Sequence, residues 1–180
     1  CRALEKNGTS LFLPTLITAD EAVYRRNLPL MAAALRRAEV RRVVAGFHLE
    51  GPFISPDDGY RGAHPKAAVR NPAPVFLDKL QELSRGEVKL LTLAAARPGA
   101  AGRVRHAVSK GICVSLGHQA ARAEDLAKAV EAGATGLTHL GNGIPSTLPR
   151  HPNAVWDGLA EDRLIAFVIT DGHHVPLEVL

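Results

Sequence analysis

Short runs of apolar residues alternate along this chain with longer segments rich in Ala, Leu, Arg and Glu. The apolar runs predict strands near residues 11–17, 43–48, 88–94, 112–117, 134–139 and 164–170. The longer segments predict helices near residues 19–38, 75–85, 100–109, 121–131 and 153–161, where apolar positions recur at helical spacing. This alternation is typical of repeated βα units around a parallel sheet, so we expect an α/β fold.

Six predicted strands are compatible with two architectures. A closed (β/α)8 barrel of the TIM type has eight strands and about 250 residues, so a chain of 180 residues would form only part of one. An open doubly wound sheet accommodates six strands without any loss. Periodicity does not distinguish the two. Because no repeat, low-complexity tract or linker interrupts the sequence, we expect a single domain over residues 1–180.

Composition excludes several classes of protein. Hydrophobic residues make up 46% of the chain, enough for a core, while the net charge of +4 comes from basic residues that are interleaved with acidic ones. With only 4% aromatic residues to stack on bases, we expect no nucleic-acid partner. No apolar stretch approaches the roughly twenty residues that cross a bilayer, so we expect no membrane partner either.

The two cysteines and the chain ends carry further expectations. Cys113 lies in the apolar run 111–116, which predicts a buried strand, and the other cysteine is Cys1, so a disulfide framework is not indicated and the reducing cytoplasm is the expected location. The chain starts with Cys rather than Met and stops in the apparent start of a helix at Val175–Leu180. We therefore expect the sequence to continue at both ends.

Potential ligands follow four of the predicted strands, namely His48 with Glu50, then His118, then His139, and finally the segment 171–174 (DGHH). In parallel α/β folds such residues converge, because the carboxyl ends of the strands lie at one edge of the sheet. Glu50, His118 and His139 supply one carboxylate and two imidazoles, a set that suits a divalent metal with one coordination position open for water. One such histidine is usually structural, but four strand ends together favour a shared metal site.

Other residues of this kind are given structural roles. We expect His48 to be structural, Asp171 to cap a following helix, and His106 and His151 to lie on the surface or in loops. A metal at the strand ends favours hydrolysis, because it makes water more acidic and polarises a carbonyl group. The leaving amine then needs a proton donor. No carboxylate of this chain is an obvious candidate, so no catalytic acid or base is assigned.

Several short segments occur together in a distinctive order. Residues 46–53 (GFHLEGPF) resemble a segment that carries a metal-binding glutamate, and residues 117–118 and 138–142 (THLGN) resemble two segments with metal-binding histidines. Residues 7–15 are similar to the second strand of a barrel, residues 62–64 (GAH) to a sugar-contacting loop, and residues 171–174 to a later histidine segment. Taken together, these motifs resemble the N-acetylglucosamine-6-phosphate deacetylases of the amidohydrolase superfamily.

The resemblance implies a single incomplete amidohydrolase barrel that contains about strands 2 to 7, with a metal site at the carboxyl ends of the strands. It implies metal-dependent hydrolysis of the acetamide of N-acetylglucosamine 6-phosphate to glucosamine 6-phosphate and acetate. One divalent ion, zinc or iron, would be held by Glu50, His118 and His139. The implied substrate-binding residues are His64, Asn142, Gly143, Arg150 and His174. Arg150 would reach the phosphate bound by the neighbouring subunit of a homodimer. The family's catalytic aspartate is expected after Leu180.

Two departures from the family pattern keep other functions open. Gly143-Ile144 stands where the family usually has Ala-Met, and Ala95-Ala96 stands where Pro-Glu is common. A related amidohydrolase acting on another N-acyl or cyclic amide is therefore an alternative. A second alternative, which rests on the lack of an assigned general acid or base, is a catalytically silent remnant that binds a metal or a sugar phosphate.

Overall fold

A computed structural model describes residues 1–71 and 73–179. Six parallel strands form one sheet in it: β1 (Thr15–Ile17), β2 (Phe47–Glu50), β3 (Val88–Leu93), β4 (Cys113–Leu116), β5 (Gly136–Leu137) and β6 (Ile165–Ala166). All six predicted strands are confirmed, although each is shorter than the apolar run that predicted it. Every strand pairs in parallel with the next one along the chain.

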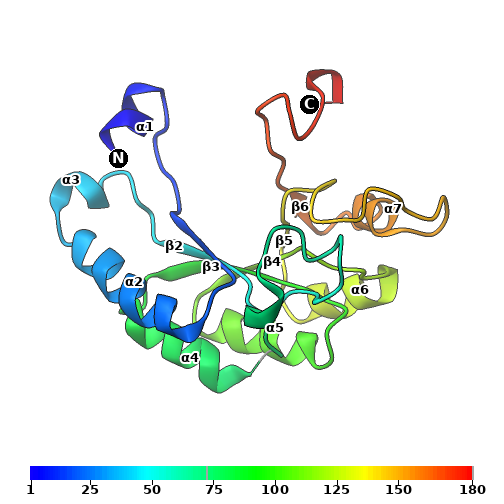
Figure 1. The fold of residues 1–180 in the computed structure, drawn as a ribbon, viewed down its shortest axis with the longest axis horizontal. Helices are drawn as coiled ribbons and strands as arrows, with labels where there is room; N and C mark the ends of the chain where they lie inside the picture. The colour runs from blue at the N-terminus through cyan, green and yellow to red at the C-terminus, as the bar shows by residue number, and fades with distance from the viewer. Residues whose placement is uncertain (72, 180) are drawn as a thin grey trace.

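The order of the strands separates the two architectures that the sequence left open. A doubly wound sheet reverses its strand order at a switch point, whereas this sheet runs β1-β2-β3-β4-β5-β6 without reversal. Each crossover therefore proceeds in the same direction, as in a TIM barrel. Among the described residues the sheet is not closed. Figure 1 shows the main helices along one side of the curved sheet, with both chain ends on the other side.

The helices occupy the intervals between the strands: α1 (Arg2–Lys6), α2 (Glu21–Ala34), α3 (Ala38–Arg41), α4 (Pro74–Leu83), α5 (Ala100–Ser109), α6 (Ala123–Glu131) and α7 (Ala154–Leu159). Two short 3-10 helices, η1 (Lys66–Ala68) and η2 (Leu177–Val179), complete the fold. The helix predicted over 19–38 is α2, which ends at Ala34; α3 begins only at Ala38, after Arg37, whose backbone is extended. The sequence predicted neither α1 nor α3. The helix predicted at 175–180 is only η2, and Leu180 lies outside the described residues.

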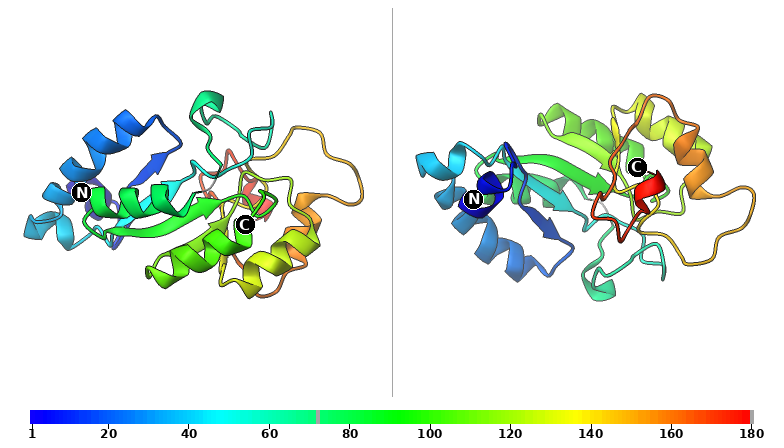
Figure 2. Two further views of the ribbon diagram at one scale, coloured as in Figure 1. Left: turned by 90° about the horizontal axis from the view of Figure 1, so that it is seen from below. Right: turned by 90° about the horizontal axis from the view of Figure 1, so that it is seen from above.

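The core lies between the helices and the outer face of the sheet. Alternation along β2 buries Phe47 and Leu49 on this face, and Leu91 and Val114 follow the same pattern on the next two strands. Each such side chain contributes about 1.5–3 kcal/mol by its burial. Seen from below, α4, α5 and α6 lie side by side over the strands (Figure 2). In the described part of the chain, no helix has the length and apolarity needed to span a membrane.

Polar side chains occupy the opposite, concave face of the sheet and form one hydrogen-bonded row. His48 contacts the hydroxyl of Thr15 through Nδ1 at 3.0 Å and that of Thr92 through Nε2 at 2.8 Å. The row continues from Thr92 to Thr138 at 2.8 Å and from Thr138 to Ser115 at 2.7 Å. Burial lowers the pKa of His48 to about 4, so the imidazole is neutral at pH 7. The structural role predicted for His48 is thereby confirmed.

Two sequence expectations about individual residues were wrong. Cys113 belongs to a strand, as predicted, but its side chain is exposed. The reason is the alternation along β4: Val114 faces the helices, so Cys113 faces the concave side of a sheet that is open there. His106 is not a simple surface residue, because its Nε2 lies 2.8 Å from Asp78 and the ring is partly buried between α5 and α4.

Candidate metal centre

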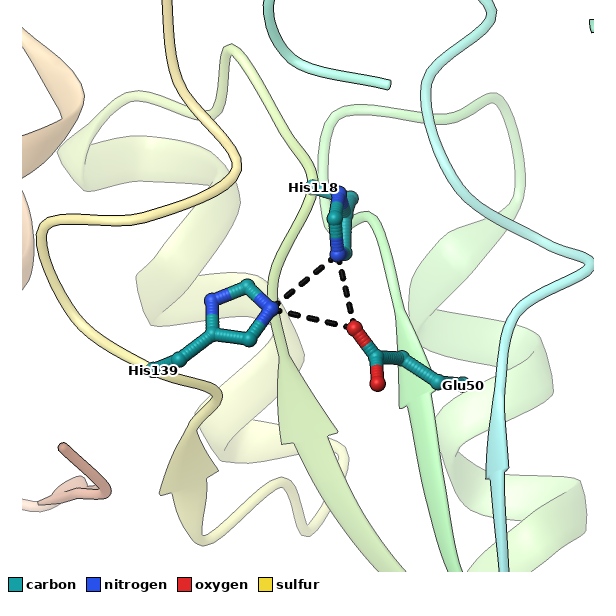
Figure 3. Close-up of side chains that lie close together, drawn as sticks. All are labelled: Glu50, His118 and His139. Atoms are coloured by element: carbon teal, nitrogen blue, oxygen red, sulfur yellow. Dashed lines mark hydrogen bonds and ion pairs between the residues drawn. The ribbon is translucent and has the colours of Figure 1, made fainter. Parts of the chain in front are cut away.

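The three predicted ligands lie together at the carboxyl edge of the sheet. Glu50 is the last residue of β2, and His118 and His139 each lie two residues beyond the ends of β4 and β5. Glu50 Oε1 is 2.8 Å from Nε2 of His118 and 3.0 Å from Nε2 of His139, and the two Nε2 atoms are 3.0 Å apart. Figure 3 shows the three side chains pointing toward one another from separate elements.

This donor set fits a divalent cation. Nitrogen and oxygen ligands lie roughly 2.0–2.2 Å from zinc, so two ligands of the same ion are separated by about 3–3.5 Å. The three observed separations of 2.8–3.0 Å are close to that value. One carboxylate and two imidazoles are a combination that suits zinc and iron. The residues present therefore fit a single ion of this kind.

The backbone at both histidines is held in the left-handed region, with φ of 52° at His118 and 33° at His139. For a residue other than glycine such a conformation costs about 1–3 kcal/mol, and it occurs mainly where function requires it. Gly117 makes the arrangement possible, since a Cβ added there would lie 2.8 Å from Cβ of Thr138. The ends of β4 and β5 can therefore approach closely enough to bring the imidazoles together.

A backbone carbonyl fixes the tautomer of His118. Nδ1 of this residue lies 2.9 Å from the carbonyl oxygen of Tyr60, which can only accept, so Nδ1 carries the proton. In the neutral ring Nε2 therefore carries the lone pair that a metal ligand needs; without an ion, a proton on Nε2 makes the hydrogen bond to Glu50. Tyr60 could not be predicted from the sequence, because its contribution comes from the backbone. The side chain of His118 itself is buried.

Glu50 is strongly biased toward its ionised form. Burial acts to raise the pKa of this carboxyl, but hydrogen bonds with His118, His139 and His64 outweigh burial and hold the pKa well below its usual range. A lone pair on His118 Nε2 cannot face a carboxylate oxygen at 2.8 Å without a proton or a cation between them. The site therefore calls for positive charge at its centre, which a divalent ion supplies.

His64 joins the cluster as a hydrogen-bond donor. Its Nδ1 accepts from the backbone N–H of Thr18 at 3.3 Å, and the Thr18 hydroxyl lies 2.9 Å away. The proton is consequently on Nε2, which lies 3.5 Å from Glu50 Oε1. His64 is 4% exposed, and in this tautomer its Nε2 is not available to bind a metal. The sequence did not predict a role for Thr18, because it belongs to no recognisable motif.

An open pocket of about 320 Å³ lies over the cluster, and four of the predicted substrate residues line it: His64, Asn142, Gly143 and His174. Nδ2 of Asn142 is buried and has no hydrogen-bond partner in the described part of the protein. A Cβ added to Gly143 would lie 2.9 Å from His118 Nδ1, so the Gly143 backbone lies directly against that imidazole.

His174 and Arg150 are the most exposed of the predicted substrate residues. His174 is exposed and bonds through Nδ1 to Asp171 at 2.7 Å. Asp171 also accepts from the backbone N–H groups of His173 and His174, so it caps a turn rather than the helix that was expected. Arg150 is exposed in the loop after β5, and it is not among the residues that line the pocket. Nothing in the structure unites Arg150 with the other predicted substrate residues.

The strands follow one another in chain order, the helices lie on the outer side of the sheet, and a Glu-His-His cluster lies at the carboxyl ends of the strands. Together these features define the fold as that of the TIM-barrel-type amidohydrolases. No family model matches the chain. The N-acetylgalactosamine-6-phosphate deacetylase of Escherichia coli O157:H7 is 34% identical over 170 residues, which cover 94% of this chain and 45% of the relative. The N-acetylglucosamine-6-phosphate deacetylase of Bos taurus is 37% identical over 180 residues, which cover 96% and 43%.

Solved structures agree with the sequence relatives. A variant of the Mycobacterium smegmatis N-acetyl-D-glucosamine-6-phosphate deacetylase, in complex with N-acetyl-D-glucosamine-6-phosphate, matches with a TM-score of 0.83 and 28% identity over 96% of this chain and 44% of that one. The chain is therefore homologous to the N-acetylglucosamine- and N-acetylgalactosamine-6-phosphate deacetylases along nearly its whole length, and the resemblance of its motifs is confirmed. It spans less than half the length of these relatives.

Proposed function

We propose that the protein removes the acetyl group from an N-acetylhexosamine 6-phosphate and releases acetate and the hexosamine 6-phosphate in amino-sugar catabolism. The observation that carries this proposal is the convergence of Glu50, His118 and His139 beneath a pocket of about 320 Å³. The relatives support it, since they are deacetylases of N-acetylglucosamine 6-phosphate or N-acetylgalactosamine 6-phosphate. We propose both epimers as candidate substrates.

Glu50, His118 and His139 would hold one divalent ion, zinc or iron. Such an ion supplies Lewis-acid chemistry, because it makes water more acidic and polarises a carbonyl group. The low pKa of Glu50 keeps the carboxylate ionised for this purpose. The Nδ1–H of His118, held by the Tyr60 carbonyl, keeps the ring oriented with Nε2 toward the ion.

The pocket walls offer hydrogen-bond donors to an anionic sugar. Nε2–H of His64 faces the cluster from one wall, and the buried Nδ2 of Asn142 lacks a partner among the residues described. We propose that Asn142 and the backbone N–H of Gly143 receive the phosphate, while His64 and His174 contact the sugar phosphate. The exposed guanidinium of Arg150 would reach the phosphate of the neighbouring subunit in a homodimer, where a bidentate contact suits phosphate.

Two coarser features belong to the same proposal. We propose that residues 1–180 form a single incomplete barrel domain, because all six strands belong to one sheet and one hydrophobic core packs against it. A cytoplasmic location suits an enzyme that acts on a phosphorylated sugar.

The test uses the complete gene product and measures metal content and acetate release together. We expect about one zinc or iron per chain by elemental analysis, and acetate release from at least one of the two 6-phosphorylated substrates. His118→Ala should lose most of the metal and the activity. His106→Ala, which removes an imidazole from α5 away from the site, should retain both.

Two results would contradict the proposal in different ways. If His118→Ala binds as much metal as the parent protein, the ligand assignment is wrong. If the parent protein holds its metal but releases acetate from neither phosphosugar, the metal site stands and the substrate assignment falls. Activity on another N-acyl or cyclic amide would then identify the related amidohydrolase considered above.

A further inference from the structure

A loop before η1, residues 55–64, contacts His118 at three points. The backbone N–H of Ser55 donates to the His118 carbonyl at 2.9 Å, and the Tyr60 carbonyl accepts from Nδ1 at 2.9 Å. Gly62 lies against the ring, since a Cβ added there would be 3.2 Å from His118 Cε1. The orientation of this imidazole therefore depends on the position of a loop far from it in the sequence.

Arg61 holds that loop in place. One guanidinium nitrogen, Nη2, bonds to Asp58 Oδ1 at 2.6 Å, and the other, Nη1, donates to the carbonyl oxygen of His64 at 2.6 Å. Its backbone N–H donates to the Asp57 carbonyl at 2.8 Å. A guanidinium can make these contacts together because its donors are fixed in one plane. The Arg61 side chain thus links Asp58 to His64 through hydrogen bonds, and Tyr60 lies in the segment between these two residues.

The side chain of Arg61 is mostly buried, at 20% exposed, although it does not line the pocket over the metal cluster. Asp58, by contrast, is 80% exposed. An exposed ion pair alone contributes little to stability. The contact with the buried backbone at His64 is different, because His64 in turn faces Glu50. Arg61 therefore acts on the site through the loop and not by touching the substrate.

We propose that Arg61 is a positioning residue for the metal centre: it keeps the Tyr60 carbonyl on His118 Nδ1 and so keeps Nε2 available as a ligand. This inference rests on the proposed metal site. If the loop moved away, Nδ1 would lose its acceptor and the ring could place its proton on Nε2, where it blocks metal binding. Loss of an outer partner of a metal ligand weakens metal binding by about ten- to a hundredfold.

The experiment measures the Kd of the complete gene product for Zn²⁺ by competition with a chromogenic chelator, and the Tm of the metal-free protein. Arg61→Ala should raise the Kd about ten- to a hundredfold. Arg61→Lys should have the Tm of the parent protein but only part of its affinity for Zn²⁺, because one ammonium group cannot bond to Asp58 and to the His64 carbonyl at once. Arg41→Ala is the control: it breaks a 2.9 Å ion pair with Glu87 at the opposite end of the strands and should leave the Kd unchanged.

The outcomes separate this inference from the proposed function. If the parent protein binds no Zn²⁺, the metal site itself is wrong and Arg61 loses its role with it. If the parent binds Zn²⁺ and Arg61→Ala binds it with the same Kd, the positioning role is overturned while the site stands. If Arg61→Ala does not fold, Arg61→Lys decides the matter. Its ammonium can hold only one of the two partners of the guanidinium, so its Kd should rise in the same direction; an unchanged Kd would overturn the proposal.

Discussion

Tyr24 is buried in the core, and its hydroxyl forms hydrogen bonds with the backbone of the segment that follows β1, beside the metal cluster. Tyr24 is 0% exposed on α2, and its hydroxyl donates to the Ile17 carbonyl at 3.0 Å and accepts from the Ala19 N–H at 3.2 Å. These two residues flank Thr18, which holds His64. Tyr24→Phe leaves two backbone groups without their partner, so we expect a loss of about 1–3 kcal/mol in the free energy of unfolding at neutral pH.

The same substitution should change how stability depends on pH. Burial raises the pKa of Tyr24 to about 12 from its ordinary value of 10. In alkaline solution the unfolded chain therefore gives up this proton before the native state does. The stability that Tyr24 contributes is fully present below pH 10 and is lost as the pH rises toward 12. Between pH 8 and pH 11 the loss amounts to about 1.4 kcal/mol.

Urea unfolding followed by circular dichroism checks both numbers. The difference in unfolding free energy between the parent protein and Tyr24→Phe should shrink by about 1.4 kcal/mol from pH 8 to pH 11, because Phe cannot ionise. If the Tyr24→Phe difference is the same at both pH values, the buried hydroxyl does not titrate as argued and the reasoning is refuted.

Two further predictions concern phosphate recognition and strand packing. Arg150→Ala should raise KM for the phosphorylated sugar with less effect on kcat, lowering kcat/KM about ten- to a hundredfold, as loss of one charge-assisted contact predicts. Equal losses on the unphosphorylated sugar would mean that Arg150 supports the loop instead. Gly117→Ala should destabilise the protein by about 1–3 kcal/mol, because the new Cβ would meet Thr138 at 2.8 Å. Gly102→Ala, an exposed position within α5 where a Cβ meets nothing within 4 Å, should stabilise it by about 0.5–1 kcal/mol; the opposite ranking in urea unfolding would contradict the geometry.

The metal ligands could be predicted from the sequence because each of them lies at the carboxyl end of a strand or within two residues of it. Strand ends in a parallel sheet share one edge, so Glu50, His118 and His139 had to lie near one another in any fold built from these βα units. The groups that orient them could not be predicted. The Tyr60 carbonyl, the Thr18 N–H and the guanidinium of Arg61 act through backbone atoms or through a loop, and no residue type or spacing in the sequence marks such contacts.

By itself, the sequence determined the elements of this protein: six apolar runs long enough for strands and helical segments with one apolar face, since local periodicity is set by backbone geometry. The order of the strands was decided only by tertiary structure, because pairing depends on the direction of each crossover and both architectures have the same periodicity. Tertiary structure also decided the side of the sheet that Cys113 faces, the end of α2 at Ala34, and the left-handed backbone at His118 and His139. These features depend on contacts between segments distant in the chain, and such contacts leave no local pattern in the sequence.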